Sequence, residues 1–68
     1  MNVGDVRSLL AVVEGEAKDG DNEGAHAAQD HLYVTVLAAI AAGIADDPKA
    51  MATEALRVAN IKFFRWYA

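Results

Sequence analysis

Apolar residues recur every three or four positions along three stretches of the chain, which is the period of an amphipathic helix. We therefore predict helices over about residues 3–18, 25–43 and 48–66. Both connections between these segments are short, so successive helices should pack as antiparallel neighbours. The pattern predicts an all-α fold, a small three-helix bundle in which residues 1–68 form a single domain.

The same spacing predicts which side of each helix is buried. For the first helix the expected core residues are Val3, Val6, Leu9, Leu10, Val13 and Ala17. For the second they are Leu32, Tyr33, Val36, Leu37, Ile40 and Ile44. For the third they are Ala52, Ala55, Leu56, Ala59, Phe63 and Trp66, with Met51, Val58 and Ile61 beside or outside the stripe.

Turn and cap residues separate the predicted helices. Residues 19–24 contain two glycines and no apolar side chain, which is typical of a turn. Gly43 is a plausible end for the second helix. Asp47 suits the N-cap of the third helix, and Pro48 suits its first position, where the missing N–H is not needed.

The small size of the chain favours self-association. A domain of 68 residues buries a limited share of its surface, and small scaffolds commonly add a disulfide, a metal or a second subunit. The chain has no cysteine, which excludes a disulfide. Alanine and glycine at 38, 39, 42 and 43 would also let another helix approach closely. We therefore expect a homodimer that completes the bundle.

Four of the five aromatic residues stand in the last six positions of the chain. Tryptophan, tyrosine and arginine are enriched at the energetic centres of interfaces. The sequence thus predicts an interface formed by Phe63, Phe64, Arg65, Trp66 and Tyr67. The alternative is that all four rings fill the core of their own subunit.

Charge is distributed unevenly along the acidic chain. Residues 1–47 carry nine acidic residues against Arg7 and Lys18, whereas residues 48–68 carry four basic residues against Glu54. The net charge of −4 disfavours nucleic acid as a partner. A small DNA-binding helix-turn-helix protein, with its turn near Gly43, is the alternative function, although the acids in that turn oppose phosphate binding.

The residues that could hold a cation or perform catalysis form no convincing site. Asp19, Asp21 and Gly24 match three positions of a calcium loop, but Glu23, His26 and Asp30 depart from it. The cluster of His26, Asp30 and His31 lacks the four ligands of a structural zinc site. No nucleophile or phosphate-binding motif is present. We expect no metal, no cofactor and no enzymatic activity.

The segment from His26 to Ala68 resembles small proteins of actinobacteria and their phages. The residues that carry this resemblance are Gln29 to Tyr33, Val36 to Gly43, Glu54 to Leu56, and Ile61 with Phe63 and Arg65 to Ala68. The resemblance brings no activity or functional residues. It implies an accessory protein of a phage or an actinobacterium, acting in the bacterial cytoplasm.

Residues Leu32 to Ala45 carry no charge, but this run is too short to cross a bilayer, and no secretory signal begins the chain. The expected function is therefore binding, as an adaptor or as an inhibitor of a bacterial or host protein. The binding surface would be helical, and the protein would also pair with itself.

Overall fold

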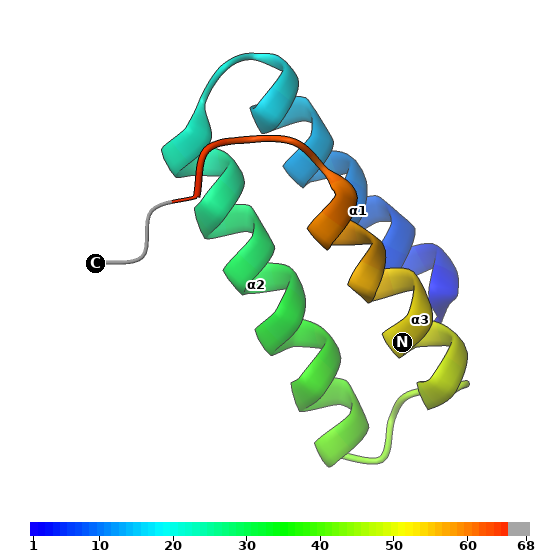
Figure 1. Cartoon of the computed structure of the whole chain (residues 1–68). Helices are drawn as coiled ribbons and strands as arrows, with labels where there is room; N and C mark the ends of the chain where they lie inside the picture. Colours follow the sequence, from blue (N-terminus) through cyan, green and yellow to red (C-terminus); the bar gives the residue numbers. More distant parts are fainter. Residues whose placement is uncertain (66–68) are drawn as a thin grey trace.

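The computed structural model describes residues 1–65 of the chain. Within these residues, three α-helices and a short 3₁₀ helix follow one another: α1 (Val3–Lys18), α2 (Asn22–Ala41), α3 (Pro48–Leu56) and η1 (Arg57–Asn60). The α-helices lie side by side, and α2 runs antiparallel to α1 and α3 (Figure 1). The predicted all-α three-helix bundle is confirmed.

Side-chain caps determine where each helix begins. The side chain of Asn2 accepts from the backbone N–H of Asp5 at 3.0 Å, and the Asp5 carboxylate accepts from the Asn2 N–H at 2.9 Å. This reciprocal capping box satisfies two N–H groups that the first turn leaves without partners. Asp47 caps α3 through the Ala50 N–H, with Pro48 as the first helical residue, as predicted.

The second helix starts earlier than predicted. Asp21 is its N-cap and accepts from the Gly24 N–H at 2.8 Å, so α2 begins at Asn22 rather than at residue 25. The predicted turn at 19–24 is therefore confined to its first three residues. The sequence pattern placed the boundary too late because the first turn of α2 carries no large apolar residue.

Two glycines with positive φ end the first two helices. Gly20 has φ of 79° and Gly43 has φ of 72°, a backbone region that disfavours other residues. After α2, the N–H of Gly43 bonds to the carbonyl of Ile40, and the N–H of Ile44 bonds to that of Ala39. This Schellman pattern ends α2 at Ala41, two residues before the predicted end at residue 43.

The core is centred on the surface where the three helices meet. Its buried apolar residues are Val6, Leu10, Val13, Ala25, Leu32, Val36, Ala39, Met51, Ala55 and Val58. The buried face predicted for α1 is confirmed at Val6, Leu10 and Val13. In α2, however, Leu37 is exposed, whereas Ala25, Gln29 and Ala39 are buried; Ile44, which follows the helix, is exposed as well. Small residues on this face of α2 allow α1 to approach closely.

The predicted third helix over 48–66 is wrong in its second half. The α-helix ends at Leu56, η1 ends at Asn60, and residues 61–65 are not helical. Phe63 therefore does not continue the stripe of α3, and Trp66 lies outside the described residues. Met51 and Val58, predicted beside the stripe, are fully buried, whereas Ala59 and Leu56 are exposed.

Candidate interaction surface

The segment after η1 crosses the end of the bundle and reaches the first turns of α2 (Figure 1). Phe63 is half-buried and packs against the core. Phe64 is largely exposed, and its backbone N–H donates to the side-chain oxygen of Asn22 at 3.2 Å. Of the five residues predicted to form an interface, the structure thus brings Phe63, Phe64 and Arg65 to one end of the molecule. Trp66 and Tyr67 lie outside the described residues.

Arg65 fastens this segment to the rest of the chain. Its Nε donates to Oε1 of Gln29 at 3.0 Å, and one terminal nitrogen donates to the carbonyls of Val58 at 3.0 Å and Ile61 at 2.9 Å. Its guanidinium carbon also lies 3.8 Å from the centre of the Phe63 ring, a cation–π contact. The described interactions of Arg65 are intramolecular, and its predicted contact with a partner stays a prediction.

The contacts of the Arg65 guanidinium also help to explain why the helical backbone ends after η1. Carbonyls at the end of a helix lack backbone partners, and a basic side chain can satisfy them. Here the guanidinium bonds to the Ile61 carbonyl and to the Val58 carbonyl, which also accepts from the Ile61 N–H at 3.1 Å. The same group gives a partner to Gln29, the one buried polar residue among residues 1–65.

A second apolar surface lies on the outward side of α2. Val34 is 66% exposed and Leu37 is 64% exposed, and Ala38 and Ala41 beside them are exposed as well. These four residues share one side of the helix, because at about 100° per residue their positions fall within an arc of about 100°. We call them the outer face of α2. No charged residue occurs on α2 between Leu32 and its end.

A groove between α2 and α3 borders the outer face on one side. Its volume is about 160 Å³, and its lining is almost entirely apolar: Tyr33, Val36, Leu37, Ile40, Ala52, Ala55 and Leu56. Leu37 therefore belongs to both the groove and the outer face. Leu56, at the end of α3, is 64% exposed at the rim. Binding sites commonly combine such an apolar hollow with protruding apolar side chains.

A shallower hollow borders the outer face on its other side. It is lined by Met1, His31, Val34, Thr35, Ala38, Ala39, Ala42 and Ile44. The backbone beside it is well ordered by hydrogen bonds, since the Met1 ammonium donates to the Ile44 carbonyl at 3.0 Å and the Asp46 N–H donates to the Met1 carbonyl at 2.9 Å. The outer face thus forms a ridge between two hollows.

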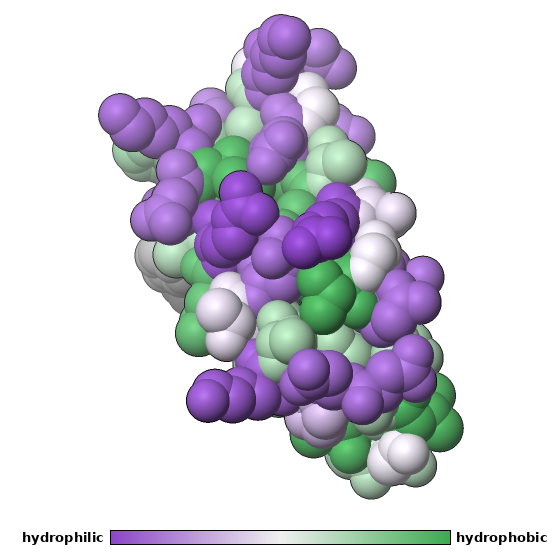
Figure 2. Space-filling view, turned by 90° about the vertical axis from the view of Figure 1, so that its right-hand side faces the viewer, coloured by the Kyte–Doolittle hydropathy of each residue, from purple (hydrophilic) through white to green (hydrophobic). Residues whose placement is uncertain are grey.

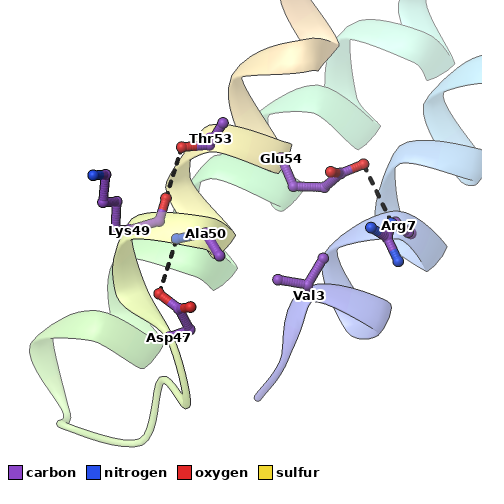
Figure 3. A pocket seen from close by; sticks show the side chains of 7 residues that line it. All are labelled: Val3, Arg7, Asp47, Lys49, Ala50, Thr53 and Glu54. Carbon is purple, nitrogen blue, oxygen red and sulfur yellow. Dashed lines mark hydrogen bonds and ion pairs between the residues drawn. The ribbon is translucent and has the colours of Figure 1, made fainter.

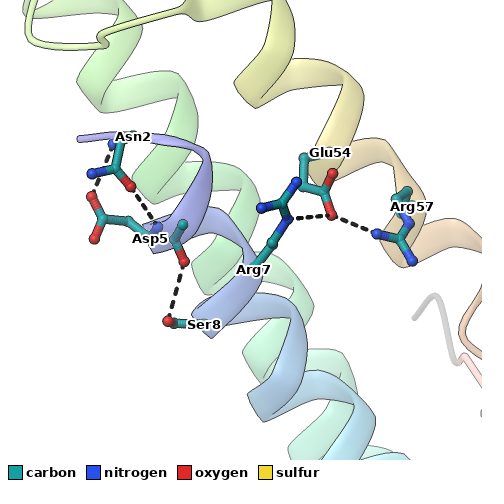
Figure 4. Close-up of polar contacts among 7 residues, drawn as sticks. Asn2, Asp5, Arg7, Ser8, Glu54 and Arg57 are labelled. Carbon is teal, nitrogen blue, oxygen red and sulfur yellow. Dashed lines mark hydrogen bonds and ion pairs between the residues drawn. The ribbon is translucent and has the colours of Figure 1, made fainter.

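The side of the molecule that carries α1 and α3 is more polar than the outer face of α2. Figure 2 views this side and shows hydrophilic side chains spread across it, with smaller apolar areas between them. The Glu54 carboxylate of α3 lies 3.5 Å from Nε of Arg7 and 2.6 Å from a terminal nitrogen of Arg57 (Figure 4). The pair with Arg7 links α3 to α1, and the pair with Arg57 links α3 to η1.

An open hollow lies on this polar side, between the start of α1 and the first turns of α3 (Figure 3). Its lining combines Val3 and Ala50 with the charged or polar side chains of Arg7, Asp47, Lys49, Thr53 and Glu54. Asp47 is occupied as the cap of α3, and the Thr53 hydroxyl donates to the Lys49 carbonyl at 2.8 Å. Glu54 is engaged by the ion pairs described above. The hollow therefore consists of groups that already stabilise the fold.

The acidic turn between α1 and α2 is packed tightly against Gly24. A Cβ added at Gly24 would lie 2.4 Å from an Asp21 oxygen and 2.8 Å from a Glu16 oxygen. A side-chain hydrogen bond to Asp21 and the negative charge of Asp21 raise the pKa of Glu16, and partial desolvation and Asp19 add to the effect. The carboxyl groups of Glu16 and Asp21 therefore repel each other less when Glu16 is protonated.

Helix α2 passes through the segment that was compared with a calcium loop. Its residues from Asn22 onward are helical, and Asp21 uses a carboxylate oxygen as a cap. His26 lies 3.7 Å from Asp30 on the same helix. Among residues 1–65 no three histidine or acidic side chains are grouped so that they could hold a metal ion.

Comparisons with protein-family models, curated proteins and solved structures return no match. Within residues 1–65, no helix is both long enough and apolar enough to span a membrane. The outer face of α2 was not singled out by the sequence pattern, although a signal for it exists. The charge-free run that begins at Leu32 leaves the second half of α2 without a charged residue on any side, whereas one buried stripe requires apolar residues on one side only.

Proposed function

We propose that this protein is a small, non-enzymatic protein-interaction module that binds through a helical surface. The observation that carries the proposal is the outer face of α2, where Val34 and Leu37 are largely exposed beside an apolar groove. A helix that is apolar on every side ordinarily has neighbours on every side. In the single subunit α2 has neighbours on its inner side only, so a partner would complete its surroundings.

Leu37 is the expected anchor of this surface. It protrudes from the outer face and also lines the groove between α2 and α3. Interfaces derive most of their binding energy from a few apolar or aromatic residues surrounded by other contacts that exclude water. Leu56 and Tyr33 would provide those surrounding contacts. The C-terminal aromatics remain proposed as a second contact, with Phe64 the exposed member among the described residues.

The biological setting proposed from the resemblance is an actinobacterial cell, where the protein would act as an adaptor or inhibitor. The alternative of a DNA-binding protein has less support. Arg7 and Arg57 both contact Glu54, and Arg65 donates to acceptors within its own chain. Groups held in this way are less available to phosphate oxygens. A salt-dependent gel shift with duplex DNA would favour the alternative.

Affinity capture followed by titration tests the proposal. Proteins captured from an actinobacterial lysate by the wild type would be purified and titrated with the wild type, Leu37→Asp and Val12→Asp. Val12 is a matched control, because it is 53% exposed but lies on α1. We expect Leu37→Asp to weaken binding at least tenfold and Val12→Asp to leave it unchanged. Equal affinity of all three for every captured protein would refute the outer face of α2 as the binding surface.

A further inference from the structure

We propose that the groove between α2 and α3 binds an amphipathic helix of a partner protein, with a lysine or arginine of that helix facing Asp30. The inference rests on the proposed function and specifies the chemical class of its partner. It is drawn from three features of the groove: its apolar lining, its course between two antiparallel helices, and the exposed carboxylate beside one of its ends.

The apolar lining determines which kind of backbone can enter the groove. Apart from the hydroxyl of Tyr33, the side chains that line it are aliphatic. An extended segment pressed against such a lining would leave backbone N–H and C=O groups without partners, which costs free energy. A helix pairs these groups within itself. The lining therefore favours a helix over an extended peptide as the occupant.

The course of the groove also suits a helix. It is lined by α2 and α3, which lie side by side and antiparallel (Figure 1). From Tyr33 to Ile40 it follows α2 for about 10 Å, at the helical rise of about 1.5 Å per residue. A helix laid along this path would contact both α2 and α3 and complete a four-helix bundle. Its apolar residues would recur every three or four positions, as in other helices that bind in grooves.

A carboxylate lies beside one end of the groove. Asp30, Tyr33 and Leu37 are separated by three and four positions, so Asp30 shares their side of α2, one turn before the groove begins. Its side chain is 66% exposed and lies 3.7 Å from His26. Among residues 1–65, no lysine or arginine forms an ion pair with it. A basic side chain of the partner would therefore meet an accessible acid at this end.

The opposite end of the groove has no such preference for one sign of charge. Lys49 precedes Ala52 by three positions, but Asp46 and Asp47 are close to it in sequence. Asp30 therefore determines which end of the partner helix is basic. The net charge of −4 acts in the same direction, because it attracts a basic partner and repels a second acidic copy of the chain.

The contact would be small. A helix that reaches from Ile40 to Asp30 has about three turns, and it buries less than the roughly 800 Å² per partner of a standard interface. We therefore expect weak binding, and the titration must reach high protein concentrations. An exposed ion pair changes the affinity by up to about fivefold, and salt screens it. The apolar contact at Leu37 should accordingly matter more than the charge at Asp30.

Two designed helical peptides test the inference. Both carry the same apolar stripe of two turns, and one turn beyond it one peptide has an arginine and the other a glutamate. The fluorescence anisotropy of each labelled peptide would be followed as the protein is added. We expect the arginine peptide to bind the wild type about fivefold more tightly than the glutamate peptide, and high salt to reduce this preference.

Variants of the protein separate the two contacts. Asp30→Lys should reverse the preference, so that the glutamate peptide binds more tightly. Glu14→Lys is its matched control, because it changes the net charge equally at an exposed position of α1, and it should keep the preference of the wild type. Leu37→Asp should weaken both peptides at least tenfold, and Val12→Asp should not. Circular dichroism confirms that each variant is folded.

Three results would overturn the inference. The first is that neither peptide binds the wild type at the highest protein concentration that stays in solution. The second is a preference that Asp30→Lys leaves unchanged or that Glu14→Lys alters equally. The third is a dimeric mass of the wild type that Leu37→Asp abolishes, which would show that a second copy occupies the groove. The titration of captured proteins judges the proposed function separately, so the two failures are distinguishable.

Discussion

The guanidinium of Arg65 donates a hydrogen bond to the side-chain oxygen of Gln29 at 3.0 Å, across 36 positions of sequence. Gln29 is buried, and Arg65 also binds the carbonyls of Val58 and Ile61. One side chain thus satisfies a buried amide and the end of η1 at once. It also contacts the ring of Phe63, which packs against the core, so residues 61–65 are part of the fold.

Removal of this contact should destabilise the protein. In Arg65→Ala, the Gln29 oxygen loses its donor, and an unsatisfied buried polar group costs about 1–3 kcal/mol. Arg65→Lys should recover little of the loss, because lysine lacks the planar fork that reaches several acceptors. The free energy of unfolding, measured by urea denaturation, checks both variants.

A double-mutant cycle with Gln29→Leu separates the energy of the Arg65–Gln29 contact from the other contributions of Arg65 to stability. We expect the double variant to be less destabilised than the sum of the single changes, since leucine removes the acceptor that Arg65 leaves unsatisfied. Additive losses would show that Arg65 acts only through the end of η1 and through Phe63.

Glycines 15 and 24 should respond oppositely to alanine, although both lie in helices. A Cβ at Gly15 meets nothing within 4 Å, so Gly15→Ala should stabilise α1 by about 1 kcal/mol through helix propensity. At Gly24 the same methyl would lie 2.4 Å from the Asp21 carboxylate and displace the cap of α2. The loss of a cap costs about 1 kcal/mol, so Gly24→Ala should show no net gain.

Thermal melts of the two glycine variants provide the comparison, each variant serving as the control for the other. A gain in Gly24→Ala as large as that in Gly15→Ala would mean that Asp21 and Glu16 move aside without cost. The tight turn described above would then contribute little to stability.

Glu16 should make stability depend on pH. Because Asp21 raises the pKa of Glu16 in the folded chain, the folded state binds a proton more readily than the unfolded state. This contribution is present below the ordinary pKa of the group and is lost as pH rises through the raised pKa. Glu16→Gln removes the repulsion with Asp21, so at neutral pH it should melt at a higher temperature than the wild type.

The advantage of Glu16→Gln should shrink as the pH falls from neutral to about 4, where the wild-type carboxyl becomes protonated. Thermal melts of both proteins across this interval check the prediction. A constant difference in melting temperature at all pH values would contradict the raised pKa.

The core of α3 should depend on Met51 and not on Leu56. Met51 is fully buried, so Met51→Ala should cost about 2–5 kcal/mol. Leu56 is 64% exposed, and Leu56→Ala should change the stability by less than about 0.5 kcal/mol. Urea denaturation of the two variants measures both values. A loss of stability in Leu56→Ala as large as that in Met51→Ala would show that Leu56 is also buried, as the sequence pattern predicted.

The number and order of the α-helices, the start of α3 and the glycine that ends α2 could be predicted from sequence because their signals are local. Asp47 with Pro48 starts α3, and Gly43 ends α2 through its own backbone conformation. The buried sides of α2 and α3 could not be predicted as well. The second half of α2 has no charged residue, so periodicity alone does not choose between the side with Leu37 and the side with Ala39.

The path of the C-terminal segment depends on contacts far apart in sequence. Phe63 continued the predicted stripe of α3, and only the contacts of Arg65 with Gln29 and of Phe64 with Asn22 explain why the chain crosses to α2 instead. The outer face of α2 was missed for a related reason. Because Leu32 and Ala39 are buried in the core, Val34 and Leu37 on the other side of α2 are left exposed.

Titration of captured actinobacterial proteins with the wild type, Leu37→Asp and Val12→Asp tests the central claim most directly. The outer face of α2 predicts that Leu37→Asp weakens binding at least tenfold, whereas Val12→Asp, which changes an exposed residue of α1, binds like the wild type. Equal affinity of all three proteins for every captured protein would contradict the account.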